Sequence, residues 1–122
     1  MDYGKYVFVD FENVQSINVG RIGKDTKVYI VLGGKQGKIR ADLIQKIQPF
    51  GNAVEWLRVK SNGQKNALDF FIAYYLGYCV SKNGNKEYII YSKDTGYDPL
   101  IEYLRGKKVK IKRIVNFDQI GN

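Results

Sequence analysis

The sequence has 122 residues, of which 44% are hydrophobic and 26% are charged, and its 20 Lys and Arg against 12 Asp and Glu give a net charge of +8. This length suits one domain, residues 1–122, around one core. The lack of histidine, with Cys79 as the one cysteine, excludes histidine-based catalysis and the usual zinc sites. No apolar stretch approaches the roughly 20 residues that span a bilayer, and the N-terminus shows no signal-peptide pattern, so we expect a reduced, cytoplasmic protein without a membrane partner.

Short apolar runs alternate with helical patterns along the chain. In chain order these patterns predict a strand at 5–10, a short helix within 14–24, a strand at 26–32, a helix at 39–49, a strand at 53–60, a helix at 66–80, a strand at 87–92, a helix at 98–105 and a strand at 109–115. The helix at 66–80 is apolar nearly all round and is therefore expected to be central and buried. Strands that alternate with helices predict an α/β fold with a parallel sheet and helices on both faces.

Acidic residues follow two of the predicted strands directly. Asp10 ends the first strand, with Glu12 and Asn13 behind it, and Asp94 follows the strand at 87–92. Ligands of parallel sheets bind beyond the carboxyl ends of the strands, so we expect Asp10 and Asp94 at the same edge. Asp98 comes four residues later and precedes a proline, which is also typical of a helix N-cap.

A third acid, Asp69, falls on the apolar side of the predicted helix at 66–80. Its neighbours one and two turns further on are Ile72, Ala73 and Leu76. A carboxylate in such surroundings needs a partner, because an unpaired buried charge is strongly destabilising. Two alternatives are a favourable place in the first turn of the helix and an ion pair with Lys65.

These acids predict a metal site if they converge. Neighbouring carboxylates repel one another and raise each other's pKa unless a cation lies between them. Mg²⁺ prefers carboxylate, water and phosphate oxygens. An acidic pocket in a basic protein therefore indicates metal-assisted hydrolysis of a phosphodiester, with Lys and Arg attracting the nucleic-acid backbone.

Three blocks of the sequence, "FVDFENV", "KNALDFFIAYYLGY" and "YIIYSKDTGYDPLI", resemble the PIN-like nuclease superfamily, in particular its NYN-type and bacterial single-domain members. The resemblance implies a three-layer α/β/α sandwich with a parallel five-stranded sheet in the order 3-2-1-4-5. It also implies an endoribonuclease that uses Mg²⁺ or Mn²⁺, with four acids as catalytic and metal-binding residues: Asp10, Asp69, Asp94 and Asp98. The residues expected to support them are Asn13, Glu12, Ser92 and Lys65.

Candidate RNA contacts lie near the same edge of the sheet. Lys35 and Lys38 follow the strand at 26–32, and Lys65 is expected close to phosphate or to Asp69. Tyr97 is the exposed tyrosine expected to stack on an unpaired base, whereas the tyrosines of the helix at 66–80 are expected in the core. The basic residues at 105–113 either bind RNA or protect an edge strand from pairing with another molecule.

Other protein classes fit the sequence less well. The glycine spacing in "GGKQGKI" does not match a P-loop, and the strand at 53–60 lacks the terminal acid of a phosphoacceptor receiver domain. Two alternative functions stay open for a protein with this resemblance. One is a catalytically weak or inactive module that binds RNA or a protein, and the other is a toxin nuclease controlled by an antitoxin or another regulatory protein. Single-stranded DNA as a second substrate and a homodimer also stay open.

Overall fold

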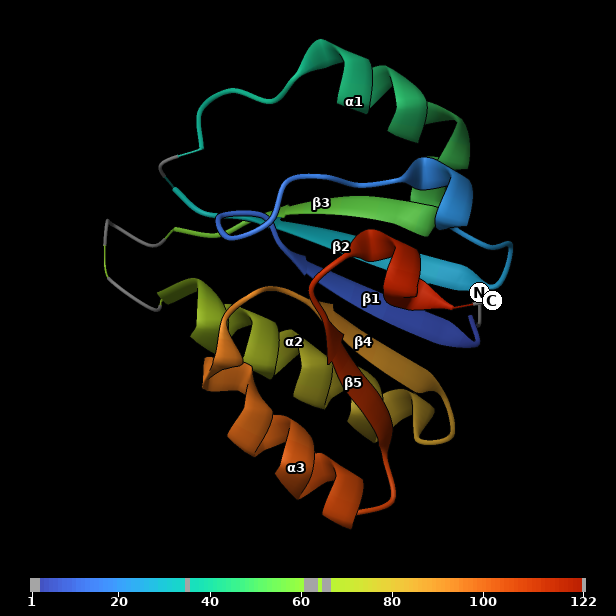
Figure 1. Ribbon diagram of the computed structural model, residues 1–122, viewed down its shortest axis with the longest axis vertical. Helices are drawn as coiled ribbons and strands as arrows, with labels where there is room; N and C mark the ends of the chain where they lie inside the picture. The colour runs from blue at the N-terminus through green and yellow to red at the C-terminus, as the bar shows by residue number, and fades with distance from the viewer. Residues whose placement is uncertain (1–2, 35, 61–63, 65–66, 122) are drawn as a thin grey trace.

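Five apolar runs of the chain form one parallel sheet in this computed structural model, which describes residues 3–34, 36–60, 64 and 67–121 (Figure 1). The strands are β1 (Lys5–Asp10), β2 (Thr26–Leu32), β3 (Val54–Arg58), β4 (Glu87–Tyr91) and β5 (Lys110–Ile114). Their order is β3-β2-β1-β4-β5, and each neighbouring pair is parallel. The predicted fold class and strand order are confirmed.

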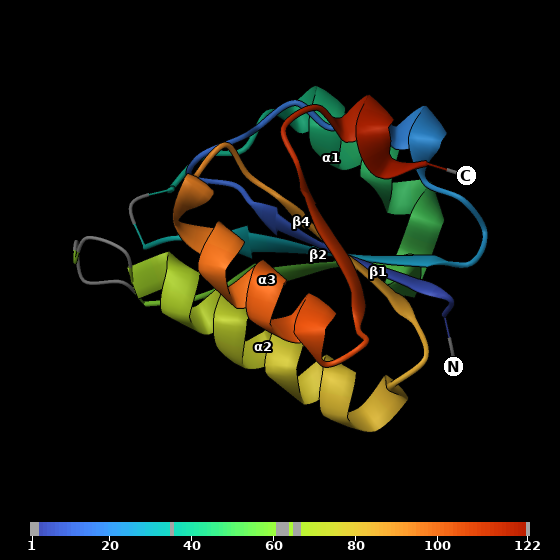
Figure 2. The same cartoon turned by 60° about the horizontal axis from the view of Figure 1, so that its bottom comes forward.

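Helices cover both faces of the sheet. One face carries α1 (Ala41–Ile47), and the opposite face carries α2 (Ala67–Asn83) and α3 (Asp98–Gly106), as Figure 2 shows most clearly. A short 3₁₀ helix, Phe117–Ile120, lies on the α1 side after β5. The short helix expected within 14–24 is a single 3₁₀ turn, Val19–Arg21. No helix in the described ranges is long and apolar enough to cross a membrane.

The core has two halves because side chains of a strand alternate between the two faces of the sheet. Val7 and Val9 of β1 belong to the half under α1, whereas Tyr6 and Phe8 belong to the half under α2 and α3. All six residues of β1 are buried, and β1 lies between β2 and β4. The end of β1, where Asp10 pairs in register with Val31, is therefore fixed from both sides.

The exposure of the outer side of α2 contradicts the prediction that this helix is buried. Its inner side chains, at spacings of three or four residues, are buried: Leu68, Ile72, Leu76 and Cys79. Its outer side is open, with Phe70 75%, Tyr74 65% and Tyr78 51% exposed. The prediction was wrong on this side because α2 is a surface helix with apolar residues on both sides.

Candidate active site

Two buried strands end side by side at the carboxyl edge of the sheet and bring the first two acids together. Asp10 is the last residue of β1, and Ser92 follows the last residue of β4. Both side chains are buried, Asp10 with 3% and Ser92 with 0% exposure. The Ser92 hydroxyl donates to Oδ2 of Asp10 at 2.9 Å and accepts from the backbone N–H of Asp94 at 3.0 Å. Ser92 therefore orients the acid of β1 and the backbone of the acid after β4 at once.

Asp94 begins a 3₁₀ turn, Thr95–Tyr97, and its own carboxylate stabilises the start of that turn. Its Oδ1 accepts from the backbone N–H of Gly96 at 2.8 Å. The turn directs the next large side chain, Tyr97, into the interior, where only 3% of it is exposed. The prediction that Tyr97 is exposed for base stacking was wrong, because this turn places its ring in the core beneath α2 and α3.

The Tyr97 hydroxyl connects the acid of β1 with the acid of α2. It lies 3.1 Å from Oδ1 of Asp69 and 3.4 Å from Oδ2 of Asp10. A phenol carries one hydrogen, so Tyr97 donates to one carboxylate at a time or shares that hydrogen between both. Burial, and then the Asp10 and Asp69 carboxylates, raise the pKa of Tyr97 above its usual value, so the hydroxyl stays protonated as a donor.

Asp10, Asp69 and Asp94 are called the acidic cluster below, and burial, followed by the neighbouring carboxylates, makes the charged forms of Asp10 and Asp69 less favourable. Burial, and then the proximity of Asp94, raise the pKa of Asp69 to about 6. Burial also raises the pKa of Asp10; hydrogen bonds from Ser92 and Tyr97 oppose this rise, while the charges of Glu12 and Asp94 add to it. The structure brings these three acids near one another, as the sequence predicts. Because neighbouring carboxylates repel, a cation between them would lower the energy of the cluster.

Asp98, the fourth predicted ligand, faces a different partner. The Arg113 guanidinium of β5 donates to both of its oxygens, from Nε to Oδ1 at 2.8 Å and from Nη2 to Oδ2 at 3.3 Å. This pairing lowers the pKa of Asp98. Asp98 is also the first residue of α3 rather than its N-cap. The structure does not bring Asp98 into the acidic cluster, because both oxygens are engaged by an arginine that the sequence places fifteen residues away.

Arg113 was predicted only as part of the basic stretch, and its structural position was missed. Its Nη1 also donates to the backbone carbonyl of Ser92 at 3.1 Å. The arginine therefore joins the edge strand, the first turn of α3 and the loop that carries Asp94. No pattern in the sequence marks this pairing, since it depends on β5 lying beside β4.

The two supporting residues after β1 have distinct positions. Asn13 is exposed, and its Oδ1 accepts from the backbone N–H of Lys93 at 2.6 Å, which joins the loops after β1 and β4. Glu12 is exposed and lies against Gly33 at the end of β2, where a Cβ atom would overlap its carboxylate. The glycine therefore makes room for Glu12 beside the acidic cluster.

The predicted basic contacts are described only in part. Lys38 is exposed in the segment after β2, whereas Lys35 and Lys65 lie outside the described residues. The segment after β2 is held to the loop after β1 by Gln36, a residue that the sequence did not single out. The Gln36 side chain donates to the Phe11 carbonyl at 2.9 Å and accepts from the Gly33 N–H at 3.2 Å.

The donor chemistry of the acidic cluster fits a hard divalent cation, because all three side chains are carboxylates. The bonds with Ser92, Tyr97 and Gly96 engage Oδ2 of Asp10, Oδ1 of Asp69 and Oδ1 of Asp94. The second oxygen of each acid takes no part in these bonds. Within the residues that the structure describes, no three acidic or cysteine side chains already surround one point as a metal cage.

Comparison with known proteins assigns the chain to a family. A family model described as PIN domain matches residues 4–114, which include all five strands and the acidic cluster. No curated protein and no solved structure gives a match. PIN domains are generally nucleases, and they typically use divalent metals. The parallel sheet in the order β3-β2-β1-β4-β5 agrees with this family, and the chain belongs to the PIN domain family.

Proposed function

We propose that this protein is a Mg²⁺- or Mn²⁺-dependent endoribonuclease that hydrolyses phosphodiester bonds of single-stranded RNA. The observation that carries the proposal is the hydrogen-bonded connection from Asp10 through Tyr97 to Asp69, with Asp94 beside it. Three carboxylates lie near one another at the carboxyl edge of the sheet, and burial together with the neighbouring charges raises the pKa of Asp10 and of Asp69. They suit a cation and the phosphate that the cation attracts.

Each residue of the site has a separate task. Asp10, Asp69 and Asp94 would hold the cation, which supplies stabilisation of the charge that develops on the phosphate and activation of the attacking water. Ser92 and Tyr97 keep the Asp10 carboxylate in one orientation by donating to the same oxygen. Because its pKa is raised, Tyr97 acts as a hydrogen-bond donor and not as a base. Ser92 and Tyr97 are thus positioning residues.

The charge of the protein supports a nucleic-acid substrate. A net charge of +8 attracts a polyanion, and the acidic cluster is a small negative site within that positive protein. Lys38, exposed after β2, and Lys93, exposed after β4, stand on loops at the edge that carries Asp10. These lysines would guide the RNA backbone toward the acids. The protein would act in the cytoplasm on RNA, with single-stranded DNA as the competing substrate.

The test is cleavage of end-labelled RNA and single-stranded DNA in Mn²⁺, Mg²⁺ or EDTA. Asp10→Asn and Asp94→Asn keep the side-chain shapes, and both are expected to abolish cleavage while the protein stays folded. Glu102→Gln, which removes one exposed acid from α3, is the matched control and should retain full activity. Cleavage that persists in EDTA, or in both variants, would exclude the proposed site. RNA binding without cleavage under any condition would instead favour a binding module.

A further inference from the structure

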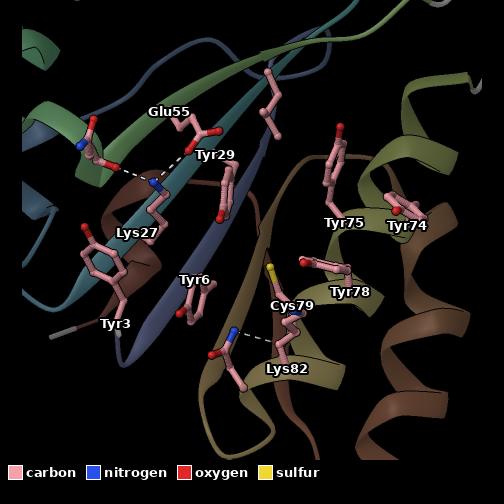
Figure 3. A pocket seen from close by; sticks show the side chains of 13 residues that line it. Tyr3, Tyr6, Lys27, Tyr29, Glu55, Tyr74, Tyr75, Tyr78, Cys79 and Lys82 are labelled. Atoms are coloured by element: carbon pink, nitrogen blue, oxygen red, sulfur yellow. Dashed lines mark hydrogen bonds and ion pairs between the residues drawn. The ribbon is translucent and has the colours of Figure 1, made fainter. Parts of the chain in front are cut away.

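A hollow lies on the α2 face of the sheet, beside β2 and β3 and apart from the acidic cluster. It is a cavity of about 700 Å³ between the second half of α2 and the part of the sheet formed by β1, β2 and β3 (Figure 3). Six tyrosines contribute to its wall: Tyr3, Tyr6, Tyr29, Tyr74, Tyr75 and Tyr78. This hollow, called the tyrosine pocket below, has the size typical of a site for a small organic group. The residues of the proposed nuclease centre do not line it.

The pocket exists because the helices on this face lie toward one side of the sheet. In Figures 1 and 2, α2 and α3 run beneath the β1, β4 and β5 side. Tyr29 of β2 and Leu57 of β3 on the same face are therefore only partly buried. Their exposed parts and the open side of α2 form two walls of one hollow (Figure 3).

The floor of the pocket is electrically balanced. The Lys27 ammonium donates to Oε1 of Glu55 at 3.0 Å and to the backbone carbonyl of Asn52. It also lies 5.2 Å from the centre of the Tyr29 ring. Since the charge of Lys27 is satisfied within the protein, the interior offers ring faces and phenol hydroxyls rather than a net charge.

The rim of the pocket carries Lys82, whose surroundings differ from those of Lys27. Lys82, in the last turn of α2, lies 5.2 Å from the centre of the Tyr78 ring. Among the described residues it forms no ion pair, so its ammonium can take an anionic partner. Ring faces stack on planar bases, phenol hydroxyls bond to base edges, and a rim ammonium attracts a phosphate. This combination has the chemistry of a nucleotide site.

Helix α2 carries both Asp69 of the acidic cluster and the pocket residues Tyr78 and Lys82. Phe70, Tyr74 and Tyr78 recur every four residues, so their rings follow one another along the helix. Asp69 of the acidic cluster precedes Tyr78 by nine residues, which corresponds to about 14 Å along the helix axis and about half a turn around it, so the two side chains leave α2 on opposite sides. A strand of RNA that reaches from Asp69 to the pocket therefore has to cross α2 as well as follow it.

We propose that the tyrosine pocket binds one nucleotide, with its base among the tyrosine rings and its phosphate at Lys82. The nucleotide comes either from a free mononucleotide or from the RNA strand that the acidic cluster cleaves. The second source rests on the function proposed above. Either source uses the same contacts, so the experiment has to distinguish them.

The chain offers a matched control for this test. Tyr78 and Lys82 lie on α2, with Lys82 5.2 Å from the centre of the Tyr78 ring, and the exposed Tyr103 of α3 and Lys46 of α1 offer the same two groups away from the pocket. The variant Tyr78→Ala/Lys82→Ala removes the pair at the pocket. Tyr103→Ala/Lys46→Ala removes the same groups and the same charge elsewhere. Tyr78 and Tyr103 are 51% and 63% exposed, so neither change opens the core.

The measurement is fluorescence anisotropy with a labelled, fully 2′-O-methylated RNA oligonucleotide in EDTA, with AMP and UMP as competitors. The pocket variant should bind at least about five-fold more weakly than the control variant, the lower end for loss of one stacked base. Competition by a mononucleotide, lost in the pocket variant, identifies the free nucleotide as the source. Weaker binding of the oligonucleotide by the pocket variant, without competition by AMP or UMP, identifies the RNA strand as the source.

Two results would overturn the proposal. One is equal affinity of both variants for every probe. The other is a change from dimer to monomer in the pocket variant by sedimentation, with RNA affinity unchanged, which would make this face an interface between copies. Cleavage by the wild type that Asp10→Asn abolishes would leave the nuclease function standing in either case. Binding that depends on the pocket, without cleavage in any metal, would refute the proposed nuclease function and support the proposed nucleotide site.

Discussion

Replacing Asp69 by asparagine tests the cost of a charged, partly buried Asp69 beside Asp94 and Asp10. The side chain keeps its shape and an oxygen that can accept from the Tyr97 hydroxyl, but it loses its charge. The pKa of Asp69 is about 6 in the folded protein against an ordinary value of 3.8. The folded state therefore binds the proton of Asp69 more tightly than the unfolded state does. Stability falls as the pH rises from about 4 through about 6, because the folded protein must then carry an unfavourable charge.

The size of this effect follows from the pKa difference of roughly two units. Each unit corresponds to about 1.36 kcal/mol, which sets an upper limit of about 3 kcal/mol. Asp69 is only partly buried, so solvent screening reduces the expected cost to about 1 kcal/mol. For a chain of this size, about 1 kcal/mol corresponds to a change of about 4 °C in Tm.

The assay is thermal unfolding in EDTA between pH 4 and pH 8. Asp69→Asn is expected to melt about 4 °C above the wild type at pH 7.5 and level with it near pH 4. Added Mn²⁺ should raise the Tm of the wild type more than that of the variant. Glu102→Gln, the exposed control, should show no such pH-dependent gain. If Asp69→Asn is no more stable than the wild type at pH 7.5, the charged Asp69 does not carry the cost of burial and repulsion that its raised pKa implies.

Three further changes test separate parts of the site. Tyr97→Phe removes one hydroxyl and should slow single-turnover cleavage by about 10–100-fold, as loss of a group that orients a metal ligand does, with little change in the circular dichroism spectrum. Ser92→Ala leaves the buried Asp10 with one donor fewer and should lower the free energy of unfolding by about 1–3 kcal/mol in urea titration. Asp98→Asn should leave the Mn²⁺ concentration for half-maximal cleavage unchanged, because Arg113 occupies both Asp98 oxygens; a marked rise would restore Asp98 as a ligand.

The sheet and the acidic cluster could be predicted because both follow from simple periodic rules. Apolar runs separated by helical patterns specify parallel strands, and the carboxyl ends of parallel strands share one edge. Asp10 and Asp94 were therefore expected together before any geometry was known. Asp69 was expected with them because a carboxylate on the apolar side of a helix needs a partner.

The errors concern side chains whose surroundings depend on contacts between distant segments. Tyr97 lies in a polar stretch of sequence, and only the 3₁₀ turn that Asp94 begins directs its ring inward. Asp98 meets Arg113 only because β5 lies beside β4. The apolar residues on the outer side of α2 suggested complete burial, since composition alone does not tell how many elements surround a helix. Such positions can be assigned from the fold and not from local patterns.

The most direct test of the nuclease account is the rate of RNA cleavage as Mn²⁺ is titrated against the wild type and Asp10→Asn. The account predicts no cleavage in EDTA, a rate that rises to a plateau for the wild type, and no measurable rate for Asp10→Asn at that plateau. Asp10 is the buried acid to which both Ser92 and Tyr97 donate, so its charge is the least replaceable of the three. A wild-type rate that does not depend on Mn²⁺, or an Asp10→Asn rate equal to it, would contradict the account.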